Sequence, residues 1–184
     1  PEPIQYNFAT ALGPDREILR ADYKGLVMAA DWSYLDTDDP LYARHANHFE
    51  FSLKASHPKL GSNFEMGQVD LQGTRIRPLG KGRLLSRGQW VYSLAKTRSV
   101  LGLEVNQMPE FYESRTGGDR SVRGFGYQEI SPASSFTGGK HLWTASIEYE
   151  YPIFDGWNIA GFVDSGVAFN RFSRSETAIG SGLG

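Results

Sequence analysis

The chain has 184 residues, a formal net charge of −2 and no cysteine. The near-balanced charge gives no support to a general nucleic-acid interface, which needs a strong basic excess. The absence of cysteine excludes disulfides, thiolate metal sites and thiol nucleophiles. No stretch of the sequence approaches the roughly 20 apolar residues of a membrane-spanning helix. The length is sufficient for one domain with a substantial buried interior.

Apolar and polar residues alternate with a period of two through most of the chain, and no segment has a convincing 3.6-residue repeat. In the clearest case, Phe49, Phe51 and Leu53 occupy every second position, with polar residues between them. Such alternation indicates strands that have one apolar and one polar face. The fourth predicted strand is expected to contain a bulge near Gly67 or Gly73. About eight strands are predicted, over residues 4–12, 24–34, 48–56, 64–77, 84–95, 143–151 and 157–169, and from residue 177 onward.

Short turn sequences rich in Gly, Pro and Asp separate most of these segments. Because short turns join neighbouring strands, those strands are expected to pair antiparallel. One such turn, over residues 152–157, predicts a hairpin between the two strands on either side of it. The exception is a long connection over about residues 102–139, which is predicted to be a loop. The fold class is therefore all-β and antiparallel.

Which face of the strands is buried distinguishes a soluble β-domain from an outer-membrane barrel. The predicted polar faces carry full charges at mid-strand, and the alternating runs have about 9 to 11 residues, enough for a tilted strand to cross a bilayer. These features favour a transmembrane β-barrel of the outer-membrane type, with an aromatic-rich soluble domain as the alternative. The apolar faces also carry aromatic residues near several predicted strand ends, as an interfacial girdle would: Tyr6, Trp32, Tyr34, Trp90, Trp143, Tyr149, Tyr151 and Trp157.

The long connection contains a glycine-rich segment, Gly117 to Tyr127, that is unusual for a surface loop. It combines several glycines with two arginines, Arg120 and Arg123, and with two aromatic residues, Phe125 and Tyr127. Flexible surface loops are usually small and polar. The composition therefore predicts a loop that folds against an acidic surface and is held there.

Two acidic residues in the strands after this loop are candidates for that surface. Glu148 and Asp164 both lie on the polar faces of their strands, and the hairpin between these strands lets them face the same interior. Arg123, on the loop just upstream, would then make charge-assisted hydrogen bonds to both carboxylates. Three unrelated surface charges remain the alternative at this point.

The loop, from Gly117 to Phe125 with Ser131 and Pro132 after it, resembles the conserved sixth extracellular loop of the BamA/TamA superfamily of outer-membrane assembly factors. Residues 144–151 and 161–166 are similar to the next two strands of that family. The resemblance implies that the loop folds back into the barrel and that Arg123 contacts Glu148 and Asp164. It assigns Gly124 and Phe125 to the same structural lock of the loop, with Phe125 and Tyr127 packed around it. The remaining residues of the loop motif are Gly117, Gly118, Asp119, Arg120, Gly126 and Tyr127.

The compact loop resembles that of TamA more than that of BamA. A TamA-like protein would have periplasmic POTRA domains before a barrel of about sixteen strands. On this resemblance, residues 1–184 are expected to be a fragment of one C-terminal barrel domain. The POTRA domains and the first and last strands, which form the openable seam, would then lie outside it.

The resemblance implies a non-enzymatic factor of the bacterial outer membrane, without a cofactor or metal, that helps insert or secrete β-barrel or autotransporter-like clients. Its expected partners are outer-membrane lipid, unfolded client proteins and a TamB-like periplasm-spanning protein. The alternatives are a two-partner secretion transporter and a passive pore. An enzyme that uses Glu148 and Asp164 as a carboxylate pair is disfavoured, because Arg123 would keep both acids charged and remove the proton of a general acid.

Overall fold

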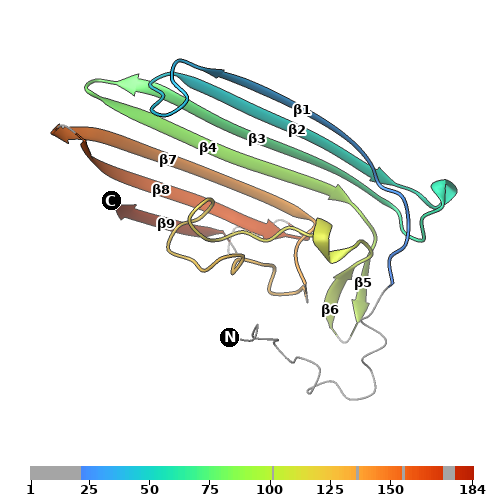
Figure 1. Cartoon of the computed structure of the whole chain (residues 1–184). Helices are drawn as coiled ribbons and strands as arrows, with labels where there is room; N and C mark the ends of the chain where they lie inside the picture. The colour runs from blue at the N-terminus through green and yellow to red at the C-terminus, as the bar shows by residue number, and fades with distance from the viewer. Residues whose placement is uncertain (1–21, 101, 136, 155, 172–176) are drawn as a thin grey trace, which may run out of the picture.

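The computed structural model describes residues 22–100, 102–135, 137–154, 156–171 and 177–184. Within these ranges the chain forms a seven-stranded antiparallel sheet and a separate two-stranded hairpin (Figure 1). The sheet has the order β1-β2-β3-β4-β7-β8-β9. Its strands are β1 (Met28–Thr37), β2 (Ala46–Ser56), β3 (Met66–Leu79), β4 (Gly82–Leu94), β7 (His141–Phe154), β8 (Trp157–Phe169) and β9 (Ala178–Leu183). This confirms the predicted all-β, antiparallel fold class.

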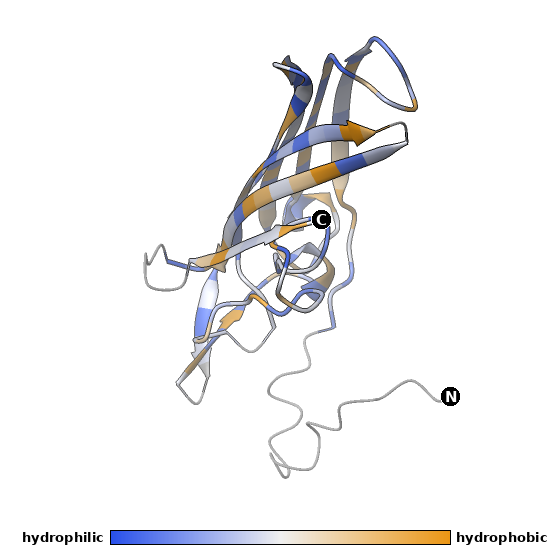
Figure 2. Ribbon diagram, turned by 90° about the vertical axis from the view of Figure 1, so that its left-hand side faces the viewer, coloured by the Kyte–Doolittle hydropathy of each residue, from blue (hydrophilic) through white to orange (hydrophobic). Residues whose placement is uncertain are grey.

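Each strand of the sheet pairs with its neighbour in sequence, except that β4 pairs with β7 across the long connection. β1 and β9 lie at the two edges, so the sheet is open, and it curves around the long connection (Figures 1 and 2). A curved, open antiparallel sheet is what part of a barrel wall looks like. Seven of the predicted strands correspond to strands of this sheet; the first, over residues 4–12, lies outside the described residues. In the part of the chain that the structure describes, no helix has the length and apolar character to cross a membrane.

The predicted bulge near Gly67 or Gly73 was wrong. β3 pairs with both of its neighbours in unbroken register through these two glycines. Gly73 instead makes room for an aromatic ring, because a Cβ atom there would lie 3.3 Å from the ring of Phe49. A register irregularity lies between Pro152 and Phe154, where β7 approaches the turn into β8. Proline has no N–H to donate to the ladder, which accounts for the irregularity.

The prediction of a loop over the whole of residues 102–139 was also wrong in part. Residues 97–100 and 103–106 pair as two four-residue strands, β5 (Thr97–Val100) and β6 (Leu103–Asn106). Gly102, with φ of +84°, lies in the turn between them. Strands this short contain too few residues for a period of two to be recognised. A single turn of 3₁₀ helix, η4 (Glu110–Tyr112), follows the hairpin.

The two faces of the sheet differ in chemistry. The face turned away from the long connection exposes large apolar side chains from every strand, including Trp32, Leu71, Trp90, Val163 and Ile179. The pattern appears in Figure 2 as alternating colours along the strands. A contiguous exposed apolar face of this extent marks a surface that meets lipid or a partner. Trp32 pairs with Phe51 at the centre of β1 and not at its end, so the expected confinement of the aromatic residues to strand ends does not hold there.

The buried core lies between the opposite, inner face of the sheet and the long connection. One cluster consists of Phe64, Met66 and Met108, where the connection covers the start of β3. A second cluster, Val91, Leu142 and Ala168, runs across β4, β7 and β8. These buried side chains fix the connection against the inner wall, and so determine where its glycine-rich tip lies.

Candidate functional site

The long connection returns to the sheet as a loop whose base is held by backbone hydrogen bonds. Ser114 exchanges two hydrogen bonds with Gly139, at 2.7 and 2.9 Å, and Thr116 exchanges two with Ile130, at 2.8 and 3.0 Å. The intervening residues 117–129 form the tip of the loop, which lies within the curve of the sheet (Figures 1 and 2). The tip therefore starts from a defined position beside β7 and β8.

Glycines shape the tip because three of them have backbone conformations that other residues rarely adopt. Gly117, Gly118 and Gly124 have φ values of +112°, +100° and +92°. At Gly117, a Cβ atom would also lie against the carbonyl oxygen of Gly126, on the opposite side of the tip. The amide of Gly118 donates to the carbonyl oxygen of Val122 at 3.2 Å, which closes a tight turn. This turn directs Val122 and the residue after it towards the sheet.

Arg123 meets Asp164 of β8 through three hydrogen bonds. Its Nε donates to Oδ2 at 2.7 Å and its Nη2 to Oδ1 at 2.9 Å, which is a bidentate pairing. Its backbone N–H also donates to Oδ2, at 3.0 Å. The side chain of Asp164 is 0% exposed. A buried carboxylate is costly unless it is paired, and here Arg123 supplies the partners for both of its oxygens.

The remaining contacts of Arg123 link the loop to β7 and, through an aromatic ring, again to β8. Its Nη1 donates to Oε2 of Glu148 at 2.5 Å, and Nη2 lies 3.3 Å from Oγ of Ser146. The guanidinium also stacks over the ring of Phe162, with Cζ 3.4 Å from the ring centroid. The hydrogen bonds to Asp164 and Glu148 raise the pKa of Arg123 above its ordinary value, so the guanidinium remains charged. We call Arg123, Glu148 and Asp164 the Arg123 cluster.

Small residues of the sheet allow the loop backbone to approach this closely. A Cβ atom at Gly180 of β9 would collide with the carbonyl oxygen of Arg123. At Gly166 of β8, a Cβ atom would lie 2.9 Å from Cγ2 of Val122, whose side chain is fully buried. The loop thus rests on two glycines that lie on the same face as Asp164.

The structure brings together Arg123, Glu148 and Asp164, and it adds several residues that the sequence did not single out: Arg87, Ser146, Phe162, Val122, Gly166 and Gly180. Arg87 of β4 donates to the same Glu148 oxygen as Arg123, at 3.1 Å. Gly166 and Gly180 occupy polar-face positions of their strands. Glycine weakens a strand, and its presence in a strand interior often marks a place where another backbone approaches closely. These two glycines could therefore have been identified from the sequence as contact positions of the loop. The contribution of Phe162 had no signal in the sequence.

The rest of the loop motif lies away from the acids. Phe125 is half-buried, whereas Gly124, Gly126, Asp119 and Arg120 are exposed. The side chain of Tyr127 is 85% exposed, so the expected packing of this residue around the cluster is wrong. The chain reverses just after it, where Gln128 has φ of +56° and the amide of Glu129 donates to the carbonyl oxygen of Gly126. This reversal turns Tyr127 away from the sheet.

Residues 5–183 match the Omp85 superfamily domain. This chain belongs to the Omp85 superfamily. Its fold is similar to the crystal structure of BamA from Haemophilus ducreyi lacking POTRA domains 1-3, with a TM-score of 0.69 and 20% sequence identity over 85% of this chain. The match spans 35% of that BamA chain.

A second cluster of this Omp85 chain lies on the inner face near the turns that join β3 to β4 and β7 to β8. Arg83 donates through Nε to Glu150 at 2.7 Å and through Nη1 to the carbonyl oxygen of Ala43 at 2.7 Å. Its guanidinium also lies over the ring of Tyr42, 3.7 Å from the centroid. Ala43 and Tyr42 belong to the turn between β1 and β2, so this turn is held against the inner wall.

The inner wall therefore carries a row of ion pairs of alternating sign. Within the described residues, no group of three or more His, Cys, Asp or Glu side chains is placed to hold a metal ion. Each acid of the row faces an arginine at hydrogen-bonding distance. Such an arrangement can fix elements to one another, which is a structural task.

Proposed function

We propose that this chain forms part of the wall of an outer-membrane β-barrel that inserts or translocates other proteins, and that the Arg123 cluster braces this wall from within. The proposal rests on the bidentate pairing of Arg123 with the fully buried Asp164. Membership of the Omp85 superfamily and the BamA-like fold support it. So does the distribution of side chains, since an apolar outer face and a charged inner face suit a barrel in a membrane.

The Arg123 cluster is suited to bracing because it joins elements that are distant in the sequence. Through one guanidinium, the loop is connected to β7 and β8, and Glu148 extends the connection to Arg87 of β4. Removing one partner of a buried ion pair costs about 3–5 kcal/mol, because the other charge is left unpaired. The loop would therefore stay docked while other parts of the barrel move.

The mechanism that we infer involves no covalent step. A client β-strand would pair with an exposed strand edge at an openable seam of the barrel, and the backbone hydrogen bonds of the seam would be exchanged for those of the client. Local thinning of the membrane at the seam would lower the cost of insertion. The braced wall, of which this chain would be part, keeps its register while the seam opens.

Within the superfamily, we propose a TamA-like protein, because the tip of the loop is compact and closes on itself between Gly117 and Glu129. Its clients would be β-barrel or autotransporter-like proteins, and a TamB-like protein would be its periplasmic partner. We also infer that POTRA domains precede this barrel in the whole protein. The similar BamA is a protein with such domains, of which its crystal structure lacks the first three.

The bracing role is tested by substituting Arg123 in the full-length protein. Arg123→Ala should reduce assembly of an autotransporter-type client in proteoliposomes by about tenfold or more, since it removes contacts worth several kcal/mol. Arg123→Lys should restore only part of the activity, because an ammonium group cannot pair in a bidentate manner.

Arg120→Ala is the matched control, since Arg120 lies on the same loop, carries the same charge and is exposed. It should assemble the client at the normal rate. Heat-modifiable migration on a gel would report whether each variant still forms the barrel. A folded Arg123→Ala variant with full assembly activity would exclude the bracing role.

A further inference from the structure

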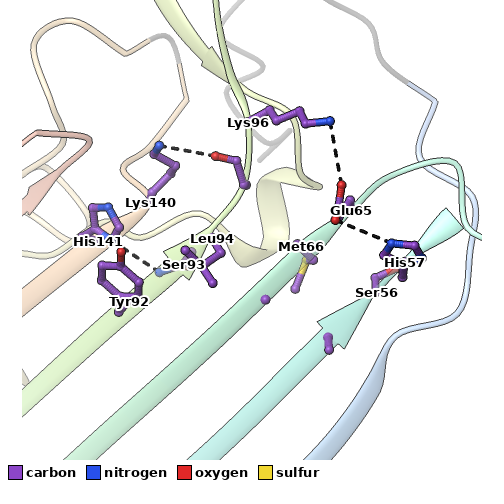
Figure 3. Close-up of a pocket in the computed structure, with 13 residues that line it drawn as sticks. Ser56, His57, Glu65, Met66, Tyr92, Ser93, Leu94, Lys96, Lys140 and His141 are labelled. Atoms are coloured by element: carbon purple, nitrogen blue, oxygen red, sulfur yellow. Dashed lines mark hydrogen bonds and ion pairs between the residues drawn. The ribbon is translucent and has the colours of Figure 1, made fainter.

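A groove opens on the outer face of the sheet, at the end where β4 ends and β7 begins (Figure 3). Its volume is about 480 Å³. Ala55, Gly67 and Leu94 lie side by side in the register of β2, β3 and β4 and line this groove. Gly67 has no side chain to fill the space, and a Cβ atom there would come no closer than 3.9 Å to any neighbour. The small residues leave a furrow beside Leu94, which is the space that the proposal below fills.

Aromatic rings flank the furrow along β4 and β7. Tyr92 stacks on Trp90, with ring centroids 5.8 Å apart, and on His141, at 4.6 Å. His141 in turn lies 5.3 Å from Phe169 at the end of β8. Rows of Trp and Tyr on the outer face of a barrel lie at the level where hydrocarbon meets the lipid headgroups. The furrow therefore lies beside this boundary, with Leu94 on its apolar side.

Cationic side chains lie just beyond the aromatic rings, at the open end of the furrow (Figure 3). Lys96 follows β4 and Lys140 precedes β7, and both line the groove. Nδ1 of His141 accepts a hydrogen bond from the backbone N–H of Ser93 at 3.3 Å, so Nε2 of the neutral ring carries a proton to donate. The rim of the groove thus offers two positive charges and one further hydrogen-bond donor.

We propose that this groove binds a membrane lipid with an anionic phosphate headgroup. One acyl chain would lie in the furrow over Gly67 and against Leu94, and the phosphate would lie between Lys96 and Lys140. Lysines beside a membrane surface attract anionic lipids, and their long aliphatic stems allow the ammonium groups to reach the headgroup level. The proposal rests on the proposed function in one respect, namely that the outer face of the sheet meets a bilayer.

Glu65 is expected to oppose this binding. Its substitution should therefore change lipid affinity in the opposite direction to substitution of the lysines. Its carboxylate lies 3.8 Å from Nζ of Lys96 and 3.6 Å from Nε2 of His57, and it lines the same groove. A phosphate would compete with this carboxylate for Lys96. Glu65→Gln should therefore strengthen the binding of an anionic lipid, whereas loss of a merely structural contact would weaken it or have no effect.

The test uses the full-length protein, with phosphatidylglycerol and phosphatidylcholine as the anionic and zwitterionic probes. Native mass spectrometry would count the lipid molecules retained as each lipid is titrated into the detergent-solubilised protein. The double variant Lys96→Gln/Lys140→Gln should bind the first phosphatidylglycerol about tenfold to thirtyfold more weakly. Lys54→Gln/Lys81→Gln is the matched control, since Lys54 belongs to the inner-face set of β2 and Lys81 lies in the turn at the other end of the sheet.

A steric variant separates the furrow from its charged rim. Gly67→Leu should weaken the retention of both lipids, because its side chain would occupy the space of the acyl chain. Equal retention of phosphatidylglycerol by the native protein, the rim variant and the Gly67→Leu variant would overturn the proposal while leaving the proposed function intact. Failure of the native protein to insert into vesicles of either lipid would overturn both.

Discussion

At the scale of single residues, the two acids that Arg123 contacts differ in what their removal would leave behind. Asp164 accepts from the backbone N–H, Nε and Nη2 of Arg123, so its loss would leave three donors without their partner in a buried place. Glu148 accepts only one hydrogen bond from Arg123, from Nη1. It also accepts one from Arg87. If Glu148 were lost, the guanidinium would still be neutralised by Asp164. Asp164 should therefore contribute more than Glu148 to the stability of the folded protein.

We expect Asp164→Ala to lower the free energy of unfolding by about 3–5 kcal/mol, as is usual when a buried ion pair loses one partner. Glu148→Ala should lower it by about 1.5–3 kcal/mol, the value of a hydrogen bond to a charged group. Urea unfolding of the vesicle-inserted protein, followed by tryptophan fluorescence, measures both quantities. Equal losses for the two variants would show that Asp164 is not the principal partner of Arg123.

The identity of these acids was accessible from the sequence because strand geometry is regular. Glu148 and Asp164 lie on the polar positions of two alternating strands joined by a short turn, and such positions must share a face. The stacking of Arg123 on Phe162 was not accessible in the same way. Phe162 is an apolar residue at a position that faces the polar side of the sheet. Only the position of the loop shows that it lies under a guanidinium.

At the scale of elements, the loop carries a built-in source of instability at Glu113. Burial raises the pKa of this residue above its ordinary value, although hydrogen bonds to Thr137 and Asn106 act in the opposite direction. Its Oε2 is buried and has no hydrogen-bond partner among the described residues. The folded state therefore binds a proton at Glu113 more tightly than the unfolded state does. Its contribution to stability is most favourable at low pH and is lost as the pH rises through the pKa of the folded state.

We expect Glu113→Gln to stabilise the protein at neutral pH, because the amide carries no charge to desolvate. The gain should vanish at a pH below the ordinary pKa of glutamate, where Glu113 is already protonated. Urea midpoints measured at about pH 4 and pH 8, on either side of this titration, give the comparison. Asp119→Asn is the control, since Asp119 is an exposed acid of the same long connection. A Glu113→Gln gain that persists unchanged at low pH would contradict the assignment.

Elements were predictable from the sequence in proportion to their length. The long strands of the sheet, such as β2 and β8, repeat the apolar–polar alternation often enough to be recognised. The four-residue strands β5 and β6 do not. The docking of the loop depends on pairs that are far apart in sequence, such as Val122 with Gly166, and periodicity within a segment contains no information about such pairs.

At the scale of the whole molecule, the inner face acts as one connected surface. The ion pairs run from Arg83 with Glu150, through Arg87 with Glu148, to Arg123 with Asp164. They join β4, β7, β8 and the loop, while the apolar side chains of the same strands point outward. A soluble protein with this sheet would have its charges and its apolar residues on the wrong faces. The outer face of this sheet is therefore suited to contact with hydrocarbon, and the inner face to a polar interior.

This inverted organisation can be tested with two neighbouring residues of β3, Leu71 and Gln72. Leu71 is on the outer face and is 41% exposed, whereas Gln72 is on the inner face. If the outer face meets hydrocarbon, Leu71→Arg should destabilise the protein in vesicles by about 2–4 kcal/mol, the cost of an arginine near the midplane of the bilayer. Gln72→Arg should change stability by less than about 0.5 kcal/mol, as is usual for an accessible polar position. If the outer face met water instead, Leu71→Arg would be as harmless as Gln72→Arg. Urea titration with heat-modifiable migration as the readout distinguishes the two cases, because only the membrane placement makes one residue of this pair intolerant of charge.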